Sequence, residues 1–304
     1  MIEVKRSPAA RVGVSALNLL SPGAGLLRIG RARSAALLLV TTPSTLLLIA
    51  AYYAVTSSLT YAGYTALMVL AVLALLGALL ISVALTWRWS REPQAKLRWW
   101  SRWYSILAVV ILGSVLASYL AGVAHGFYKS FYLPSEGMAP TLLKNDRLVA
   151  SMTLPDVLRR GDIILFDTPA GVYIKRIAGL PGDRISMSNG VVSINGDRME
   201  QRFLRTERVD GSNGWVEGRR LIERFPGEKE SHQIYDLERS PFDDVPEQIV
   251  AAGHLFVLGD NRDRSADSRV PVDLQGVEQV PITRVHGKAL FFPWGAKAGQ
   301  SINP

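Results

Sequence analysis

A lysine within an apolar strand pattern is the first residue of this sequence whose surroundings suggest chemistry. Lys175 lies in the stretch VYIKRIAGL, where strand alternation places it on the same face as Tyr173 and Ile177. If that face points inward, the loss of hydration lowers the pKa of the lysine. A lysine whose pKa falls from about 10.4 toward neutrality can accept a proton and act as a general base. At the protein surface the same side chain would be an ordinary solvated cation.

Two other segments carry polar residues that could support such a base. The stretch PSEGMAPTL, residues 134–142, follows an apolar segment directly and contains Ser135 and Gly137. The stretch GDNRDRSADSR, residues 259–269, concentrates aspartates and arginines. Read as a calcium loop that starts at Asp260, it lacks the glycine at the sixth position and the glutamate at the twelfth, which is Pro271. We therefore expect no metal ion there.

Composition excludes several other classes of site. The 304 residues include no cysteine, which excludes disulfides, thiolate metal ligands and a cysteine nucleophile. The four histidines are scattered, and no H-E-x-x-H, Walker A or G-x-S-x-G pattern occurs, so we expect no cofactor. Much of the net charge of +8 lies beside hydrophobic segments, where basic residues set membrane topology, and we expect no nucleic acid partner.

Three apolar segments predict a membrane region over residues 1–126. Each has about the 20 residues that the hydrocarbon layer of a bilayer requires. The three expected transmembrane helices are 35–55, 62–87 and 104–125. Residues 12–30 are shorter and interrupted by proline and glycine, which indicates an interfacial or re-entrant segment instead of a further span.

Basic residues predict how these spans are oriented. Arginines precede the first span and follow the second, whereas the connection at 56–61 carries no charge. The positive-inside rule then places the N-terminus and the second connection in the cytoplasm. We therefore expect a multi-pass protein of the inner cell membrane, with everything after the third span on the outer, periplasmic face.

The remainder of the chain, residues 127–304, predicts a mostly antiparallel β extracytoplasmic domain. Short β-branched runs such as DIILF, RISMS and VVSI are separated by Asn-Gly hairpin dipeptides. Residues 200–244 form a polar insertion, for which we expect a hairpin around Pro226-Gly227. The expected fold class is N-terminal transmembrane helices followed by this β domain.

Taken in order, the three stretches resemble the type I signal peptidase, or leader peptidase, family of membrane-bound Ser–Lys peptidases. The resemblance extends over about residues 127–290 and depends most on YIKRIAGLPGD and GDNRDRSADSR. It implies a monomeric endopeptidase without a cofactor that removes N-terminal signal peptides from exported proteins. Its partners would be the signal peptides of exported preproteins and the lipid bilayer.

The resemblance also implies a role for each matching residue. Lys175 matches the general base, and Ser265 matches the residue that orients its ammonium group. Four residues match positions that support the site structurally: Asp260, Arg262, Asp267 and Arg269. Two segments match those that flank an extended peptide substrate, with expected contacts from Phe131, Leu133, Pro134, Val172, Tyr173 and Ile174.

One position departs from the family pattern. The nucleophile stretch of the family reads Pro-Ser-x-Ser-Met-x-Pro-Thr-Leu, and here Gly137 occupies the place of the attacking serine. Ser135 matches the serine that helps to form the oxyanion hole. It is also a candidate substitute nucleophile, because it points to the same face of an extended chain. Its displacement of about 6.5 Å opposes this, since a base must come within about 3 Å of its partner.

Several hypotheses about activity remain open. The chain is an active peptidase with a displaced nucleophile or a rearranged loop, or a catalytically impaired pseudo-peptidase that binds exported hydrophobic segments. Alternatively, Gly137 replaces a native serine. An adaptor whose β domain is a binding module belongs to a different class. Loss of the nucleophile costs a serine peptidase about 10⁶ in turnover, and a water activated by Lys175 would start from that deficit.

Overall fold

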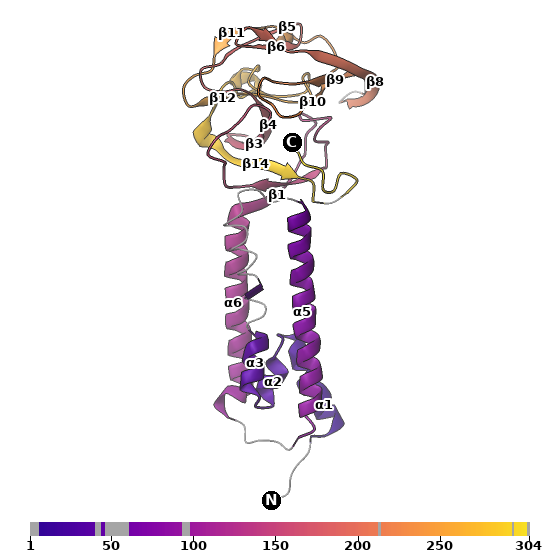
Figure 1. The fold of residues 1–304 in the computed structure, drawn as a ribbon, viewed down its shortest axis with the longest axis vertical. Coiled ribbons are helices and arrows are strands. Elements are labelled where there is room, and N and C mark those ends of the chain that lie inside the picture. Colours follow the sequence, from indigo (N-terminus) through magenta and orange to yellow (C-terminus); the bar gives the residue numbers. More distant parts are fainter. Residues whose placement is uncertain are drawn as a thin grey trace, which may run out of the picture. The chain divides into compact units, whose positions relative to one another are not determined.

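The fold is that of a computed structural model, which describes residues 6–39, 44–45, 61–92, 98–211, 214–293 and 295–302. The chain forms two compact units, Met1–Phe127 and Tyr128–Pro304 (Figure 1). The described part of the first unit is helical, and the second unit is built mainly of strands.

Two long helices dominate the first unit. Helix α5 spans Tyr61–Trp89 and helix α6 spans Trp103–Phe127. Both are long and apolar enough to cross a membrane, and few of their side chains are buried within the unit. These helices contain the segments expected as the second and third spans. The expected first span, 35–55, lies largely outside the described residues.

Short helices at the N-terminus pack against these long helices. They are α1 (Pro8–Ala16), the 3₁₀ turn η1 (Leu17–Leu19), α2 (Ala24–Arg28) and α3 (Ala32–Leu39). Buried apolar side chains of α2 and α3 form a core with Ile106 of α6 and with the partly buried Leu85 and Trp89 of α5. Residues 12–30 include the end of α1, the turn η1 and the whole of α2, so they do not form one continuous helix.

Asn18 fixes the turn between these short helices. Its side chain is fully buried, and its Oδ1 accepts hydrogen bonds from the backbone nitrogens of Gly23 and Gly25 at 3.1 and 3.0 Å. Its Nδ2 donates to Oγ1 of Thr86 on α5 at 3.0 Å. Irregular backbone tolerates an apolar environment only where its polar groups are satisfied within the protein. Asn18 meets that requirement with a single side chain.

The described residues of the second unit form three sheets, and every strand pair within them is antiparallel. The largest sheet has the order β1 (Tyr128–Tyr132), β2 (Arg147–Ser151), β14 (Val285–Phe291), β3 (Ile163–Thr168), β4 (Gly171–Gly179), β12 (His254–Leu258) and β13 (Val280–Pro281). The expectation of a mostly antiparallel β domain is confirmed. The strand pattern did not predict β1 or β2, because their residues lie beside a membrane-type segment and a proline-rich loop.

Two smaller sheets complete the unit. One has the order β11 (Val245–Ile249), β5 (Arg184–Ser188), β6 (Val191–Ile194) and β7 (Asp197–Arg198). The other is formed by the polar insertion, in the order β10 (His232–Asp236), β9 (Gly214–Glu223) and β8 (Gln201–Gly211). Strands β9 and β10 pair across the turn that contains Pro226-Gly227, so the predicted hairpin is confirmed.

Strand β4 separates two apolar cores of the second unit. Ile174 packs against one cluster, which includes Leu133 and Met138, whereas Tyr173 and Ile177 belong to another. This division is the predicted strand alternation, since successive side chains point to opposite faces. Both faces of β4 are covered, and this explains why Lys175 is buried.

Candidate active site

Lys175 lies in the middle of β4, paired with Ile164 of β3. Only 6% of the residue is exposed, and Nζ lies 5.4 Å from the centroid of the Tyr173 ring. Burial lowers the pKa of Lys175, and the positive charge of Arg269 lowers it further, whereas Asp267 and Asp260 oppose the change. The net effect favours the neutral amine, which is the form that can accept a proton.

The loop that follows β1 brings Gly137 against this lysine. Gly137 is buried, and a Cβ atom built on it would lie 3.4 Å from Nζ of Lys175 and 3.3 Å from the carbonyl oxygen of Arg264. Its backbone is outside the left-handed region, so that a residue with a side chain would meet no backbone strain. A serine side chain here would therefore begin next to the lysine, in tight contact with the carbonyl of Arg264.

Contacts at both ends hold this loop in place. The backbone of Leu133 exchanges hydrogen bonds with Asp146 and Asn145, and Met138 and Leu142 are buried in the adjacent core. Near the centre, the backbone nitrogen of Asn261 donates to the carbonyl oxygen of Gly137 at 3.2 Å. The loop is thus joined directly to the stretch that carries the aspartates and arginines.

Two buried ion pairs organise that stretch. Arg176, the neighbour of Lys175, donates to both carboxylate oxygens of Asp260 at 2.8 and 2.6 Å, and Thr141 also donates to this carboxylate. Arg269 donates to Asp267 at 2.9 Å. Burial raises the pKa of each aspartate, but the paired arginine outweighs it and leaves the pKa of both carboxyls lowered. Both groups therefore remain anionic beside the lysine.

The polar insertion contributes a third buried pair. Glu223 of β9 is fully buried and accepts hydrogen bonds from Arg262, including one from Nη1 at 3.2 Å. The backbone of Tyr235 on β10 also accepts from Arg262 and donates to Asp260. The insertion is therefore packed directly onto the stretch that supports the lysine. Sequence patterns did not predict this contact.

The hydrogen bond that the resemblance implies between Ser265 and Lys175 is not formed in this structure. Oγ of Ser265 is buried without a hydrogen-bond partner among the described residues. The side chain lies against Gly259 instead, where an added Cβ would be 2.0 Å from Oγ. Ser265 is nonetheless adjacent to the loop, because its Cα lies 3.7 Å from the Cβ position of Gly137.

A cavity of about 490 Å³ opens beside Gly137 and Lys175. All six residues expected to contact substrate line it, and so does the exposed Ser135. Tyr132, Met138, Ala170, Arg264 and Ala266 also line it and were not predicted. Arg264 forms an ion pair with Glu136 at 3.1 Å. Glu136 precedes Gly137 and Arg264 precedes Ser265, so this ion pair connects the two loops next to the lysine.

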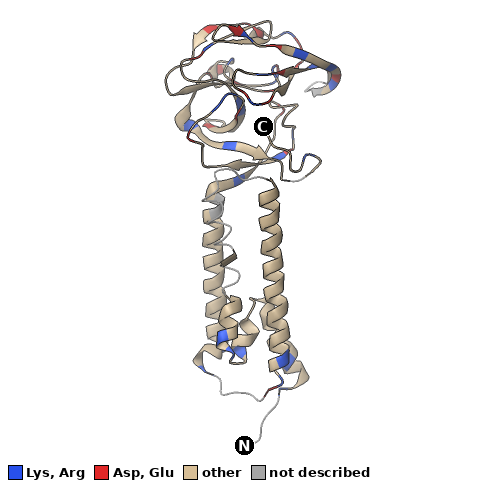
Figure 2. Cartoon of the chain, in the orientation of Figure 1, with Lys and Arg blue, Asp and Glu red and all other residues tan. Residues whose placement is uncertain are grey.

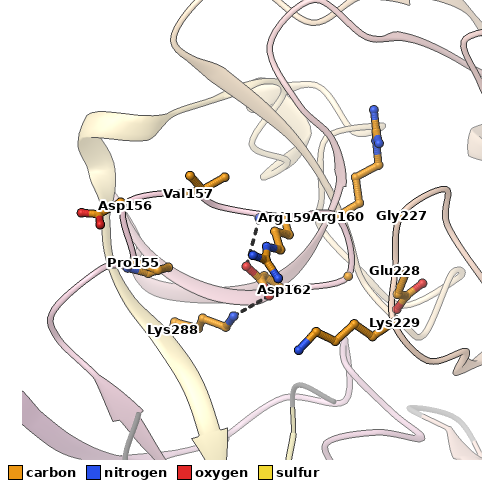
Figure 3. A pocket seen from close by; sticks show the side chains of 11 residues that line it. Pro155, Asp156, Val157, Arg159, Arg160, Asp162, Gly227, Glu228, Lys229 and Lys288 are labelled. Carbon is orange, nitrogen blue, oxygen red and sulfur yellow. Dashed lines mark hydrogen bonds and ion pairs between the residues drawn. The ribbon is translucent and has the colours of Figure 1, made fainter. Parts of the chain in front are cut away.

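A second cavity, of about 410 Å³, is not lined by Lys175 (Figure 3). Its walls carry both charge signs, and Figure 3 shows Lys288 joined to Asp162, an ion pair of 2.5 Å. Glu228 lines it as well, and this carboxylate also contacts His232 at 2.8 Å. No group of metal-ligating side chains occurs among the described residues.

A buried lysine of lowered pKa lies on the wall of this cavity, in an arrangement where an amine could accept a proton from a bound group. Residues 100–294 match the family model described as signal peptidase, peptidase S26. Because this match covers more than half of the chain, the chain belongs to the S26 signal peptidase family.

Individual relatives agree with the family model. A signal peptidase I of Bacillus caldolyticus is 30% identical over 173 residues, which cover 56% of this chain and 81% of the relative. One from Rickettsia bellii (strain OSU 85-389) is 29% identical over 230 residues, or 64% of this chain and 73% of the relative. The signal peptidase I of Pseudomonas aeruginosa is 32% identical over 189 residues, or 54% and 63%.

Proposed function

We propose that this chain is a signal-peptidase-type endopeptidase that removes N-terminal signal peptides from exported proteins, with Lys175 as general base. The position of Lys175 carries the proposal. Its Nζ lies 3.4 Å from the point where a side chain at residue 137 would begin, on the wall of a cavity of about 490 Å³. The family and the curated relatives support the same activity.

The cavity suits an extended peptide. Its walls include the chain after β1 and the first half of β4, two extended segments whose backbone can pair with a substrate strand. The carbonyl to be attacked would then lie over Gly137. The attacking hydroxyl would bond to the carbonyl carbon while the peptide C–N bond breaks, and Lys175 would take the hydroxyl proton and return it to the leaving amine. Water would then hydrolyse the ester that forms if the hydroxyl belongs to a side chain, and the lysine would end neutral after each cycle.

The absent hydroxyl at residue 137 limits the expected rate. Loss of a serine nucleophile costs about 10⁶ in turnover, so we expect slow cleavage, with Ser135 or a water molecule as the attacking group. Ser135 is the serine that lines the cavity. Gly137 also favours a second candidate function, in which the chain binds signal peptides without cutting them.

Substitution of Gly137 by serine tests the proposal. The Gly137→Ser variant should cleave a preprotein in detergent or proteoliposomes at least about 10³-fold faster than the unmodified chain, because it supplies the missing nucleophile beside Lys175. Gly137→Ala is the matched control, since it adds the same Cβ without a hydroxyl and should not gain activity. If the serine variant gains nothing, the assignment of this loop as the nucleophile loop is wrong.

Two further substitutions separate the candidate mechanisms in the unmodified chain. Ser135→Ala should abolish residual cleavage if Ser135 attacks, and should only reduce it, through loss of an oxyanion-hole donor, if water attacks. Lys175→Met should abolish cleavage in either case. Signal-peptide binding that persists in every variant, with no cleavage in any of them, would establish the binding function in place of the peptidase.

We further propose that α5 and α6 cross the inner membrane and that the chain is multi-pass and monomeric. Their lengths, and the absence of charged residues from 61–87 and 104–124, support this placement. The basic residues around them support a cytoplasmic second connection and a periplasmic β domain. The site would then meet its substrates at the outer surface of the bilayer.

A further inference from the structure

The basic character of the chain belongs entirely to its N-terminal unit. Residues 1–127 contain eleven lysines and arginines but only two glutamates, whereas residues 128–304 contain 23 basic and 24 acidic residues. The first unit is therefore strongly cationic, and the second is close to neutral. A charge difference of this kind indicates an anionic partner for the first unit.

The described cations of the first unit lie near one end of the long helices. Figure 2 shows the blue segments of this unit where α5 ends and α6 begins, and the rest of both helices is tan. Six of these arginines are exposed, and we call them the arginine collar: Arg31, Arg33, Arg88, Arg91, Arg98 and Arg102. Glu92 is the single carboxylate among the described residues of this unit, and it pairs with Arg31.

Tryptophans are interleaved with the collar. Five of the seven tryptophans of the chain lie within residues 87–103. Arg31 lies 4.9 Å from the ring centroid of Trp89, and Arg98 lies 4.2 Å from that of Trp100. Trp99 and Trp103 are exposed. Tryptophan prefers the headgroup level of a bilayer, so this end of the unit has both the cations and the aromatic rings of a headgroup contact.

We propose that the arginine collar binds the phosphate groups of anionic phospholipids in the adjacent leaflet and thereby secures residues 8–39 against α5 and α6. Glu92 pairs with Arg31, and the eleven basic residues against two glutamates leave the first unit with an excess of positive charge that lipid phosphates can neutralise. Arginines near an anionic bilayer surface are attracted to its headgroups. The inference rests on the membrane placement proposed above, but not on catalysis.

The test uses the full chain in nanodiscs of phosphatidylcholine alone or mixed equally with phosphatidylglycerol. Thermal unfolding of the first unit, followed by protease resistance of residues 8–39, should shift upward by several degrees in the anionic discs. A variant with Arg33, Arg88, Arg91 and Arg102 changed to Gln should lose most of that shift. The matched control changes four exposed arginines of the β unit to Gln, namely Arg202, Arg208, Arg239 and Arg284, and should retain it.

Three outcomes would overturn the inference. An equal shift in the collar variant would show that the arginines are not the contact. An equal shift from inorganic phosphate added to phosphatidylcholine discs would show that the collar recognises a free anion instead of a lipid. Insertion into both kinds of disc without any shift would refute the lipid preference and leave the proposed function intact. Failure to insert into either disc would refute the membrane placement as well.

Discussion

Position 137 and Lys175 together determine what this site can do. Glycine at 137 leaves the space beside Nζ open, while the lysine keeps the burial and the charged neighbours that a base requires. A lysine with only a structural role would stabilise the fold more as a charged, paired group at the surface than as a buried amine. The cost of burying this amine therefore points to chemistry, and it can be measured.

Replacement of Lys175 by methionine should raise the free energy of unfolding at neutral pH. Burial lowers the pKa of the folded lysine, so the unfolded chain binds the proton more tightly. The free energy of unfolding therefore rises with pH between the pKa of the folded lysine and about 10.4, and the lysine destabilises the fold most at lower pH. We expect a gain of on the order of 1 kcal/mol at pH 7 that shrinks toward pH 10. Denaturant titrations across this range measure it, and a gain independent of pH would contradict it.

Among the elements, the insertion sheet is joined to the site through one buried pair. Glu223 of β9 is fully buried and forms an ion pair with Arg262. The polar insertion, for which the sequence patterns predicted no role, therefore supplies the counterion of this arginine. An unpaired charge in such a place is far more costly than an exposed one. The insertion therefore stabilises the stretch next to Gly137.

Removal of this carboxylate should be strongly destabilising. Glu223→Ala should lower the free energy of unfolding of the β unit by about 3 to 5 kcal/mol, because it leaves Arg262 buried without a counterion. Glu247→Ala is the control, since its pair with Arg184 is exposed and should contribute less than about 1 kcal/mol. Burial raises the pKa of Glu223, but Arg262 outweighs burial and holds that pKa well below its usual range, so the pair's contribution should be lost progressively as the pH falls below the ordinary glutamate pKa of about 4.3. Equal losses in the two variants would contradict the assignment.

The N-terminal turn offers a second prediction at the scale of elements. A Cβ at Gly25 would lie 2.5 Å from Nδ2 of Asn18 and 2.6 Å from the carbonyl oxygen of Val14, so Gly25→Ala should displace the buried asparagine. We expect a loss of about 2 kcal/mol or more, seen as protease sensitivity of residues 8–39 in micelles. Gly77→Ala on α5 is the matched control, because nothing lies within 4 Å of its added Cβ. A control variant as sensitive as Gly25→Ala would show that this packing is not important.

At the scale of the whole molecule, the absence of cysteine makes the proposed topology directly measurable. A single cysteine at Ser231, in the insertion, should react with a membrane-impermeant maleimide in intact cells. A cysteine at Arg91, between the two long helices, should react only after the membrane is permeabilised. The contrast follows from the basic residues around the second connection. The reverse labelling pattern would place the β domain in the cytoplasm, away from exported substrates.

The sequence alone determined those features that depend on local pattern. Strand alternation placed Lys175 on one face with Tyr173 and Ile177, apolar length predicted α5 and α6, and three ordered stretches identified the family and with it the role expected of the lysine. Each of these signals is contained in consecutive residues, because side-chain direction and helix length follow from backbone geometry.

Only the tertiary structure decided which distant residues meet. It placed Nζ of Lys175 3.4 Å from the Cβ position of Gly137, joined Arg176 to Asp260, and brought Glu223 from the insertion onto Arg262. It also left Ser265 without the hydrogen bond that the resemblance implied. Such pairings depend on sheet register and on how loops close. Strand alternation predicts the face on which a side chain lies, but not which residue of a segment dozens of residues away it contacts.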